Sequence, residues 1–300
     1  MQDKAFFETK KHGAISFPYI VYRGDIPNYI HSFPLHWHDE MEIISITDGQ
    51  GIVTVRSTRY EVSRGDIIVI PTQTVHAIDR YSDCRMQYFN ILFSLSILDS
   101  IDDICHSKYF EPLHRHEISP VIYIENDTEL NRLLAPHISE LTENRHTFAT
   151  DSELLIKSKL FALLHLLITH ADDKLHEEKY FDTVNYDKLK KLLLYVREHY
   201  SERISIETAA SICAYSCSHF MKIFKNMTGQ SFTEYLVNYR LNAAANALAL
   251  TSQSVIDIAY GCGFGNLSYF SRAFVQKYGI TPSKYRAKFA KQKMRRNSSE

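Results

Sequence analysis

The 300-residue chain is poor in cysteine and has no long apolar run. Its five cysteines are scattered, odd in number and form no CxxC pair, which argues against a disulfide framework and favours reduced thiols. The longest apolar stretch, residues 160–168, contains His165 and falls far short of the roughly 20 residues of a membrane span. The first residues also lack the apolar segment of a signal peptide. We therefore expect a cytoplasmic protein with no membrane partner.

The chain has almost no net charge, −1 at pH 7, but the charge is unevenly distributed. Residues 186–300 contain 17 Lys and Arg against 7 Asp and Glu, a balance of +10, whereas residues 1–185 have a balance of −11. A basic carboxyl-terminal part favours a polyanionic partner, and an acidic amino-terminal part does not. The alternative is a basic surface that only contacts solvent.

The last hundred residues contain one pattern twice. When residues 206–235 are shifted forward by fifty positions, without a gap, identical residues coincide: Ala209 with Ala259, Ser218 with Ser268, Phe220 with Phe270, Phe224 with Phe274, Gly229 with Gly279 and Tyr235 with Tyr285. A fixed period marks a duplicated supersecondary unit. The order of short helix, tight turn, second helix and glycine is typical of a helix-turn-helix, whose second helix enters the DNA major groove. The alternative is a plain helical bundle.

Each second helix is expected to expose one long cation. At 100° per residue, the helix over 217–227 buries its phenylalanines and exposes Ser218, Met221, Lys222 and Lys225. The second copy similarly exposes Ser268 and Arg272. An arginine can donate two hydrogen bonds to guanine, and lysine bonds it more loosely. Ser216 and Asn266 are the expected N-caps, and one continuous helix over residues 232–250 should connect the units.

Residues 186–290 resemble the DNA-binding domain of the AraC/XylS family of transcription regulators. The resemblance is strongest in the second unit, over IDIA at 256–259, CGF at 262–264, YFSRAF at 269–274 and GITPSKYR at 279–286. It implies that bases are contacted by Ser218, Met221, Lys222, Leu267, Ser268, Tyr269 and Arg272, and we add Lys225 from its exposed position. Lys222 stands where the family frequently has arginine, which weakens the expected guanine contact of the first unit.

The first part of the chain has the composition of short strands. Apolar runs at 43–46, 51–55, 67–70 and 89–93 are separated by turn signals at Asp48-Gly49 and Arg64-Gly65-Asp66. Such spacing favours a β-sandwich or barrel. Two amphipathic helices should follow, from Asp127 and from about Ser152 to Ala171. The apolar stripes of these helices need a partner, which is the β-domain, the other helix or a second subunit. We expect them to mediate a homodimer.

A histidine-rich segment, HWHDEME at 36–42, is separated from Gly49 by six residues, and Gly65, Pro71 and His76 follow at set spacing. These spacings resemble both motifs of the cupin superfamily of small β-barrels, although Gln73 stands where the second motif usually has glycine. The resemblance implies two alternatives for His36, His38, Glu42 and His76. They are metal ligands, or they line a pocket for a small effector together with Tyr88. A third alternative is a structural cluster whose hydrogen bonds are satisfied within the protein. The effector pocket is the favoured interpretation, with no metal and no other cofactor, and a sugar is among the candidate effectors.

The sequence therefore predicts a multidomain α+β protein. We expect a cupin-like effector-binding β-domain over 1–125, a helical dimerisation region over 126–172, a linker over 173–185, and an all-α domain with two helix-turn-helix units over 186–292. The predicted function is a transcription regulator that binds promoter DNA under the control of a small effector, with RNA polymerase as a further candidate partner. No nucleophile–base arrangement or phosphate loop indicates an enzyme. The rival is a metal-dependent cupin enzyme fused to DNA-binding units.

Overall fold

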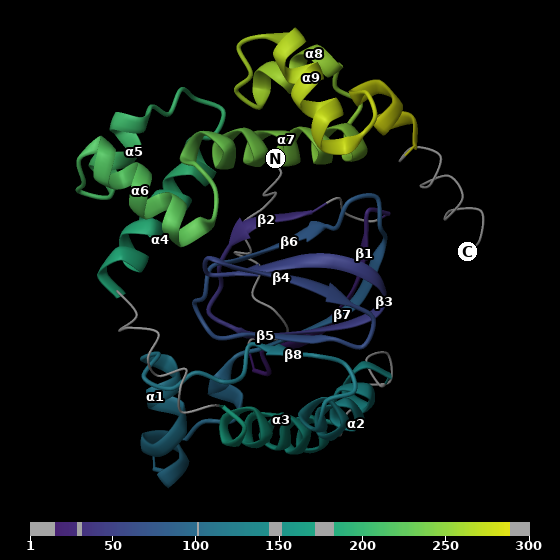
Figure 1. The fold of residues 1–300 in the computed structure, drawn as a ribbon, viewed down its shortest axis with the longest axis vertical. Coiled ribbons are helices and arrows are strands. Elements are labelled where there is room, and N and C mark those ends of the chain that lie inside the picture. The colour runs from purple at the N-terminus through teal and green to yellow at the C-terminus, as the bar shows by residue number, and fades with distance from the viewer. Residues whose placement is uncertain (1–15, 29–31, 101, 144–151, 172–182, 289–300) are drawn as a thin grey trace. The chain divides into compact units, whose positions relative to one another are not determined.

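The computed structural model describes residues 16–28, 32–100, 102–143, 152–171 and 183–288 (Figure 1). Contacts between Cα atoms group them into two compact units, which we call the N-terminal unit (16–171) and the C-terminal unit (183–288). Residues 173–182, which make up most of the predicted linker, lie outside the described residues. Helix α4 (Thr183–His199) begins directly after them. None of the helices in the described ranges is both long and apolar enough to span a bilayer.

The N-terminal unit consists of antiparallel strands in two sheets. The strands are β1 (Tyr19–Ile26), β2 (Phe33–His36), β3 (Met41–Val55), β4 (Thr58–Ser63), β5 (Ile67–Ile70), β6 (His76–Arg80), β7 (Met86–Phe93) and β8 (Tyr123–Ile124). One sheet has the order β1-β7-β3-β5-β8. In the other, β3 pairs with β4 and β6, and β6 pairs with β2. Both sheets therefore share the long strand β3 (Figure 1).

The turn predicted at Asp48-Gly49 is wrong, because β3 runs through it. The register between β3 and β7 shifts between Ile46 and Asp48, and Gly49 has a φ of +75°. A β-carbon on Gly49 would lie 1.8 Å from the Arg85 carbonyl oxygen. The glycine thus permits a bulge at which β3 passes from one sheet to the other. The turn predicted at Arg64-Gly65-Asp66 is confirmed, since the Asp66 N–H donates to the Ser63 carbonyl at 3.0 Å.

Alternate residues of β3 face two apolar clusters. Ile44 faces the interior between the sheets, where it packs with residues such as Val53, Ile78 and Tyr88. Ile43 faces the opposite side and joins the cluster formed with helices α2 (Glu129–Glu143) and α3 (Glu153–Thr169). Figure 1 shows both helices along the side of the sheet that carries β5 and β8. The apolar stripes of the predicted helices therefore pack against the sheet and one another. Between β7 and β8 lie a short 3-10 helix (Leu95–Ile97), a π-helical turn (His106–Phe110) and α1 (Glu111–His114).

The C-terminal unit is all helical, as predicted. After α4 come α5 (Ile206–Ile212), α6 (Cys217–Thr228), α7 (Phe232–Leu250), α8 (Val255–Gly261) and α9 (Leu267–Tyr278). The caps agree with prediction: Ser216 and Asn266 accept from backbone N–H groups at the starts of α6 and α9. Gly229 and Gly279 end these helices in the left-handed region, with φ of +74° and +72°. Figure 1 shows α5 and α6 at the beginning of α7 and the other pair near its end.

The repeat has a one-residue gap that the sequence comparison missed. In the first unit the Tyr215 N–H donates to the Ala210 carbonyl, and in the second the Phe264 N–H donates to the Ala259 carbonyl, an offset of 49. The left-handed turn residues Ala214 and Gly263 have the same offset. By contrast, α6 and α9 are offset by 50. The turn of the second unit is therefore one residue longer, and Ala209 corresponds to Ile258 rather than to Ala259.

Candidate DNA interface and effector cavity

The second helix of each unit exposes the side chains proposed for DNA binding. On α6 the phenylalanines Phe220 and Phe224 are buried against Phe232 of α7, with ring centroids 5.5 Å apart in each pair. The residues predicted on the opposite face are all exposed, namely Ser218, Met221, Lys222 and Lys225, and so are His219 and Asn226. On α9, Phe270 and Phe274 are buried in the same way, and Ser268, Tyr269 and Arg272 are exposed. Leu267 is half-buried and packs against the core of the second unit.

A groove of about 880 Å³ runs between α7 and α9. Tyr269 and Arg272 line it from α9, together with Gln276 and Lys277. The Lys277 ammonium donates to Asn238 Oδ1 on α7 at 3.3 Å. Cations and amides along one groove suit the phosphate backbone, which is contacted by such groups in DNA complexes. Glu234 also lines the groove, but its carboxylate accepts from Ser231 in a capping box at the start of α7.

The N-terminal unit contains a cavity of about 210 Å³. Much of its wall comes from even-numbered residues of β1 and β7, which share the interior face because side chains alternate along a strand. Of the predicted effector residues, His36, His38, Glu42 and Tyr88 line it. His76 does not line it, but lies behind Glu42. The sequence analysis missed the remaining lining residues: Tyr22, Arg23, Gly24, Phe33, Ile78, Asn90 and Leu92.

One polar atom of the cavity wall has no hydrogen-bond partner among the described residues. Asn90 Oδ1, on β7, is buried and accepts no hydrogen bond. A buried acceptor without a partner is costly, so a donor group on a bound molecule would be favoured there. Gly24, on the neighbouring strand β1, is paired with Tyr88, and because it has no side chain it leaves room for the Tyr88 ring.

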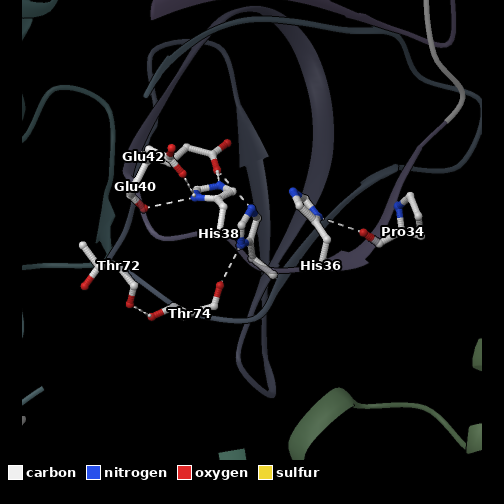
Figure 2. A network of polar contacts seen from close by, with 8 residues as sticks. Pro34, His36, His38, Glu40, Glu42, Thr72 and Thr74 are labelled. Atoms are coloured by element: carbon white, nitrogen blue, oxygen red, sulfur yellow. Dashed lines mark hydrogen bonds and ion pairs between the residues drawn. The ribbon is translucent and has the colours of Figure 1, made fainter. Parts of the chain in front are cut away.

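The predicted His/Glu cluster forms at the end of this cavity. His38 Nε2 lies 2.9 Å from Glu42 Oε2, and His76 Nε2 lies 3.0 Å from the same oxygen. Figure 2 shows His38 and Glu42 facing one another, with His36 beside them and bonded to Pro34. Glu42 and His76 are buried. The Glu42 carboxylate is therefore in contact with the imidazoles of His38 and His76 instead of with water.

Burial and neighbouring charge shift the ionisation of this cluster. Burial and the adjacent His76 and His38 hold the pKa of His36 well below its usual value, so the His36 ring is neutral. For Glu42, burial favours the acid form, but His76 and His38 outweigh it and lower its pKa well below the usual range. Burial, assisted by the charge of Glu42, raises the pKa of Tyr88, which keeps its hydroxyl as a hydrogen-bond donor.

Two known protein families match the two units. Residues 21–164 match the family described as "AraC-like ligand binding domain", and residues 209–288 match a "Helix-turn-helix domain" family. These two matches cover the cavity and both second helices.

Curated relatives are similar along most of their length. The chain is 27% identical to the transcriptional activator RhaR of Mannheimia succiniciproducens, over 88% of this chain and 91% of that protein. It is 22% identical to YdeC of Bacillus subtilis, an uncharacterised helix-turn-helix transcriptional regulator, over 95% of this chain and 97% of that protein. Among solved structures, ToxT of Vibrio cholerae has a TM-score of 0.51 at 16% identity, covering 90% of this chain and 98% of ToxT. The last similarity concerns the fold.

Proposed function

The chain belongs to the AraC/XylS family of transcriptional regulators, and on that premise we propose how its two units act. The C-terminal unit binds promoter DNA through α6 and α9. A small polar molecule occupies the cavity of the N-terminal unit and controls that binding. The cavity itself is the observation that carries the proposal, because its polar wall contains a buried Asn90 Oδ1 that has no hydrogen-bond partner among the described residues.

The DNA contacts proposed are those of the exposed faces of the second helices. Lys222 and Arg272 read bases in two neighbouring major-groove segments, with the smaller residues Ser218 and Ser268 allowing close approach. Met221 and Tyr269 add apolar contacts, Lys225 adds charge, and Leu267 supports the start of α9 from its half-buried position.

The proposed effector carries hydroxyl or carboxylate groups. Asn90 Oδ1 accepts from a ligand hydroxyl, and His36, His38 and Glu42 provide further polar contacts from the cavity wall. The Tyr88 ring offers an apolar face against which a sugar ring can pack. A monosaccharide or a small hydroxy acid therefore fits this wall.

A thermal-shift screen with monosaccharides and small carboxylic acids tests the effector. A molecule that binds only the folded state raises the unfolding temperature. The compound found is then added to a DNA-binding titration, in which we expect it to change the affinity. Asn90→Ala should weaken the response to it at least tenfold, while the exposed His114→Ala on α1 serves as the matched control. A response that is equal in both variants contradicts the proposed cavity.

We propose a cytoplasmic homodimer without enzymatic activity, for which RNA polymerase is a further partner at the promoter. The apolar stripes of α2 and α3 do not form this dimer surface, because their residues Leu134 and Leu164 are only 1% and 4% exposed and belong to the core that packs against the sheet. The outer face of α3 instead exposes Leu154 and Phe161, at 82% and 43%. These two residues are seven apart and so lie on one side of the helix, as in helix pairs that associate.

A further inference from the structure

Residues 200–202, which we call the α4–α5 segment, connect helix α4 with the second helix-turn-helix unit. Helix α4 itself packs on the first unit. The Cys213 thiol donates to the Lys188 carbonyl at 3.7 Å, and the Lys188 ammonium lies 4.1 Å from the centre of the Tyr215 ring. Tyr200, directly after α4, packs instead against the apolar core of the second unit. The α4–α5 segment therefore contacts both units.

Arg240 of the connecting helix α7 holds this segment by two hydrogen bonds. Its Nε donates to the Tyr200 carbonyl at 2.7 Å, and its Nη2 donates to the Glu202 carbonyl at 2.6 Å. A guanidinium presents its N–H groups in a rigid planar fork, so the two bonds fix the position and the direction of the segment. Burial lowers the pKa of Arg240 from its ordinary value. The side chain nevertheless keeps its charge, and a charged donor makes a stronger hydrogen bond than a neutral one.

The turn of the second unit lies directly against the α4–α5 segment. Gly263 in this turn has a φ of +82°, and a β-carbon there would lie 2.8 Å from the carbonyl oxygens of both Tyr200 and Ser201. The equivalent turn residue of the first unit is Ala214, which has a φ of +53° and is exposed. An alanine is therefore compatible with this kind of turn. The α4–α5 segment is what leaves no room for a side chain at Gly263.

A second polar connection along α7 is weaker. Asn238 Nδ2 donates to Gln230 Oε1 at 3.4 Å, and the Lys277 ammonium donates to Asn238 Oδ1 at 3.3 Å. Both distances are near the upper limit for a hydrogen bond, whereas the two bonds of Arg240 are short. Arg240 therefore makes the stronger connection between the units.

We propose that Arg240 is a positioning residue that fixes the spacing and the rotation at which α6 and α9 read DNA. The inference rests on the proposed function, in which both units bind DNA. Helix α7 alone is a single connection, about whose axis one unit can turn relative to the other. Arg240 adds a second path, from α4 through the α4–α5 segment to the turn that precedes α9. Two connections along different paths prevent this rotation.

The geometry of DNA makes such a rotation measurable. One base pair inserted between two sites moves one of them by about 3.4 Å and turns it by about 35° around the DNA axis. Two units in a fixed orientation cannot follow this change, so one of them loses base contacts. A single good base contact is worth about tenfold in affinity or more. Units that can rotate lose less, and the ratio of the affinities for correct and altered spacing therefore reports on the connection between them.

Fluorescence anisotropy titrations with three labelled duplexes test the proposal on the full-length protein. One duplex carries the operator that the protein enriches from a random library, and the others have one base pair inserted or deleted between its two blocks. Wild type should prefer the enriched spacing by about tenfold or more, and Arg240→Ala should reduce this ratio to about threefold or less. Lys191→Ala removes an exposed charge from α4 and should keep the wild-type ratio.

Two further variants separate the connection from the charge. Gly263→Ala displaces the α4–α5 segment without changing any charge and should also lower the ratio, whereas Gly261→Ala, which meets no atom within 4 Å, should not. Arg240→Lys keeps the charge but lacks the planar fork, so its ratio should lie between those of wild type and Arg240→Ala. Circular dichroism establishes which variants are folded. If Arg240→Ala and Gly263→Ala both unfold, Arg240→Lys decides.

The outcomes distinguish this inference from the proposed function. If the wild-type protein binds the two-block operator and a folded Arg240→Ala keeps the wild-type ratio, the proposed function stands and the role of Arg240 is wrong. An equal loss of affinity on all three duplexes also overturns that role, as does a wild-type protein that binds all three equally. If the wild-type protein binds no duplex specifically, the proposed function is wrong and the inference falls with it.

Discussion

Gly24 on β1 lies directly against the ring of Tyr88 on β7: a β-carbon at Gly24 would come within 2.1 Å of that ring. Both residues line the cavity, so the absence of a side chain at Gly24 sets the position of Tyr88. Gly24→Ala should therefore push the ring into the cavity, lower the stability of the N-terminal unit by about 1–3 kcal/mol and reduce effector binding. Calorimetry measures the first effect.

Gly261→Ala is the matched control, because a β-carbon at Gly261 meets no atom within 4 Å. Its stability should stay within about 0.5 kcal/mol of wild type. Equal stability of Gly24→Ala and the control would show that Tyr88 moves without cost.

Arg272 should read a guanine. Its guanidinium is exposed on α9 next to the groove, where it can donate two hydrogen bonds to one base. Arg272→Ala should cost about 1–3 kcal/mol of binding free energy and relax the base preference at one position. Binding titrations against an operator and its single-base variants measure both effects. Arg272→Lys should retain more of the DNA affinity than of the base preference. If Arg272→Ala weakens binding to specific and random DNA equally, Arg272 contacts a phosphate instead of a base.

DNA binding should be strongly salt-dependent. The sequence over 186–300 has a charge balance of +10, and cations lie on α6 and α9. With on the order of 6–10 phosphate contacts, the affinity should fall about 10³–10⁵-fold between 50 and 200 mM salt. Fluorescence anisotropy with a labelled duplex gives the slope. A nearly flat response contradicts an interface that includes both helix-turn-helix units.

Dimerisation should depend on the outer face of α3. Phe161→Glu and Leu154→Glu should give folded monomers in sedimentation experiments, because both side chains are exposed and apolar. Leu134→Glu should unfold the N-terminal unit instead, since it places a charge in the core. A glutamate at the exposed position of His114 is the control. A wild-type protein that is monomeric at micromolar concentration without DNA contradicts the proposed dimer.

The sequence predicted the second helices well and the turns between helices poorly. The phenylalanines and the terminal glycines of α6 and α9 recur with an offset of 50, so helix faces and ends could be placed to the residue. The first helices have small apolar residues at neighbouring positions, such as Ala209 and Ala210. Shifting the alignment of the two first helices by one residue therefore preserves the apolar pattern. For this reason the extra residue in the second turn left no visible gap in the sequence repeat.

In the N-terminal unit, too, some residues of the site could be predicted from the sequence and others could not. The histidines and Glu42 could be found from local spacing, whereas Tyr22, Gly24 and Asn90 could not, because their place at the cavity follows from the pairing of β1 with β7. The helical pattern alone did not show whether the two amphipathic helices pack against the β-domain, against each other or against a second subunit. The adjacent isoleucines Ile43 and Ile44 carried the missing signal, since a strand with both faces buried is apolar at successive positions.

We propose that the two helix-turn-helix units on one connecting helix read DNA together. Selection of bound sequences from a random duplex library by the full-length protein tests it most directly. We expect an enriched motif with two conserved blocks whose centres lie about 10 base pairs apart, one turn of DNA, and Arg272→Ala should remove the preference from one block only. A motif with a single block, or no enrichment at low salt, would contradict it.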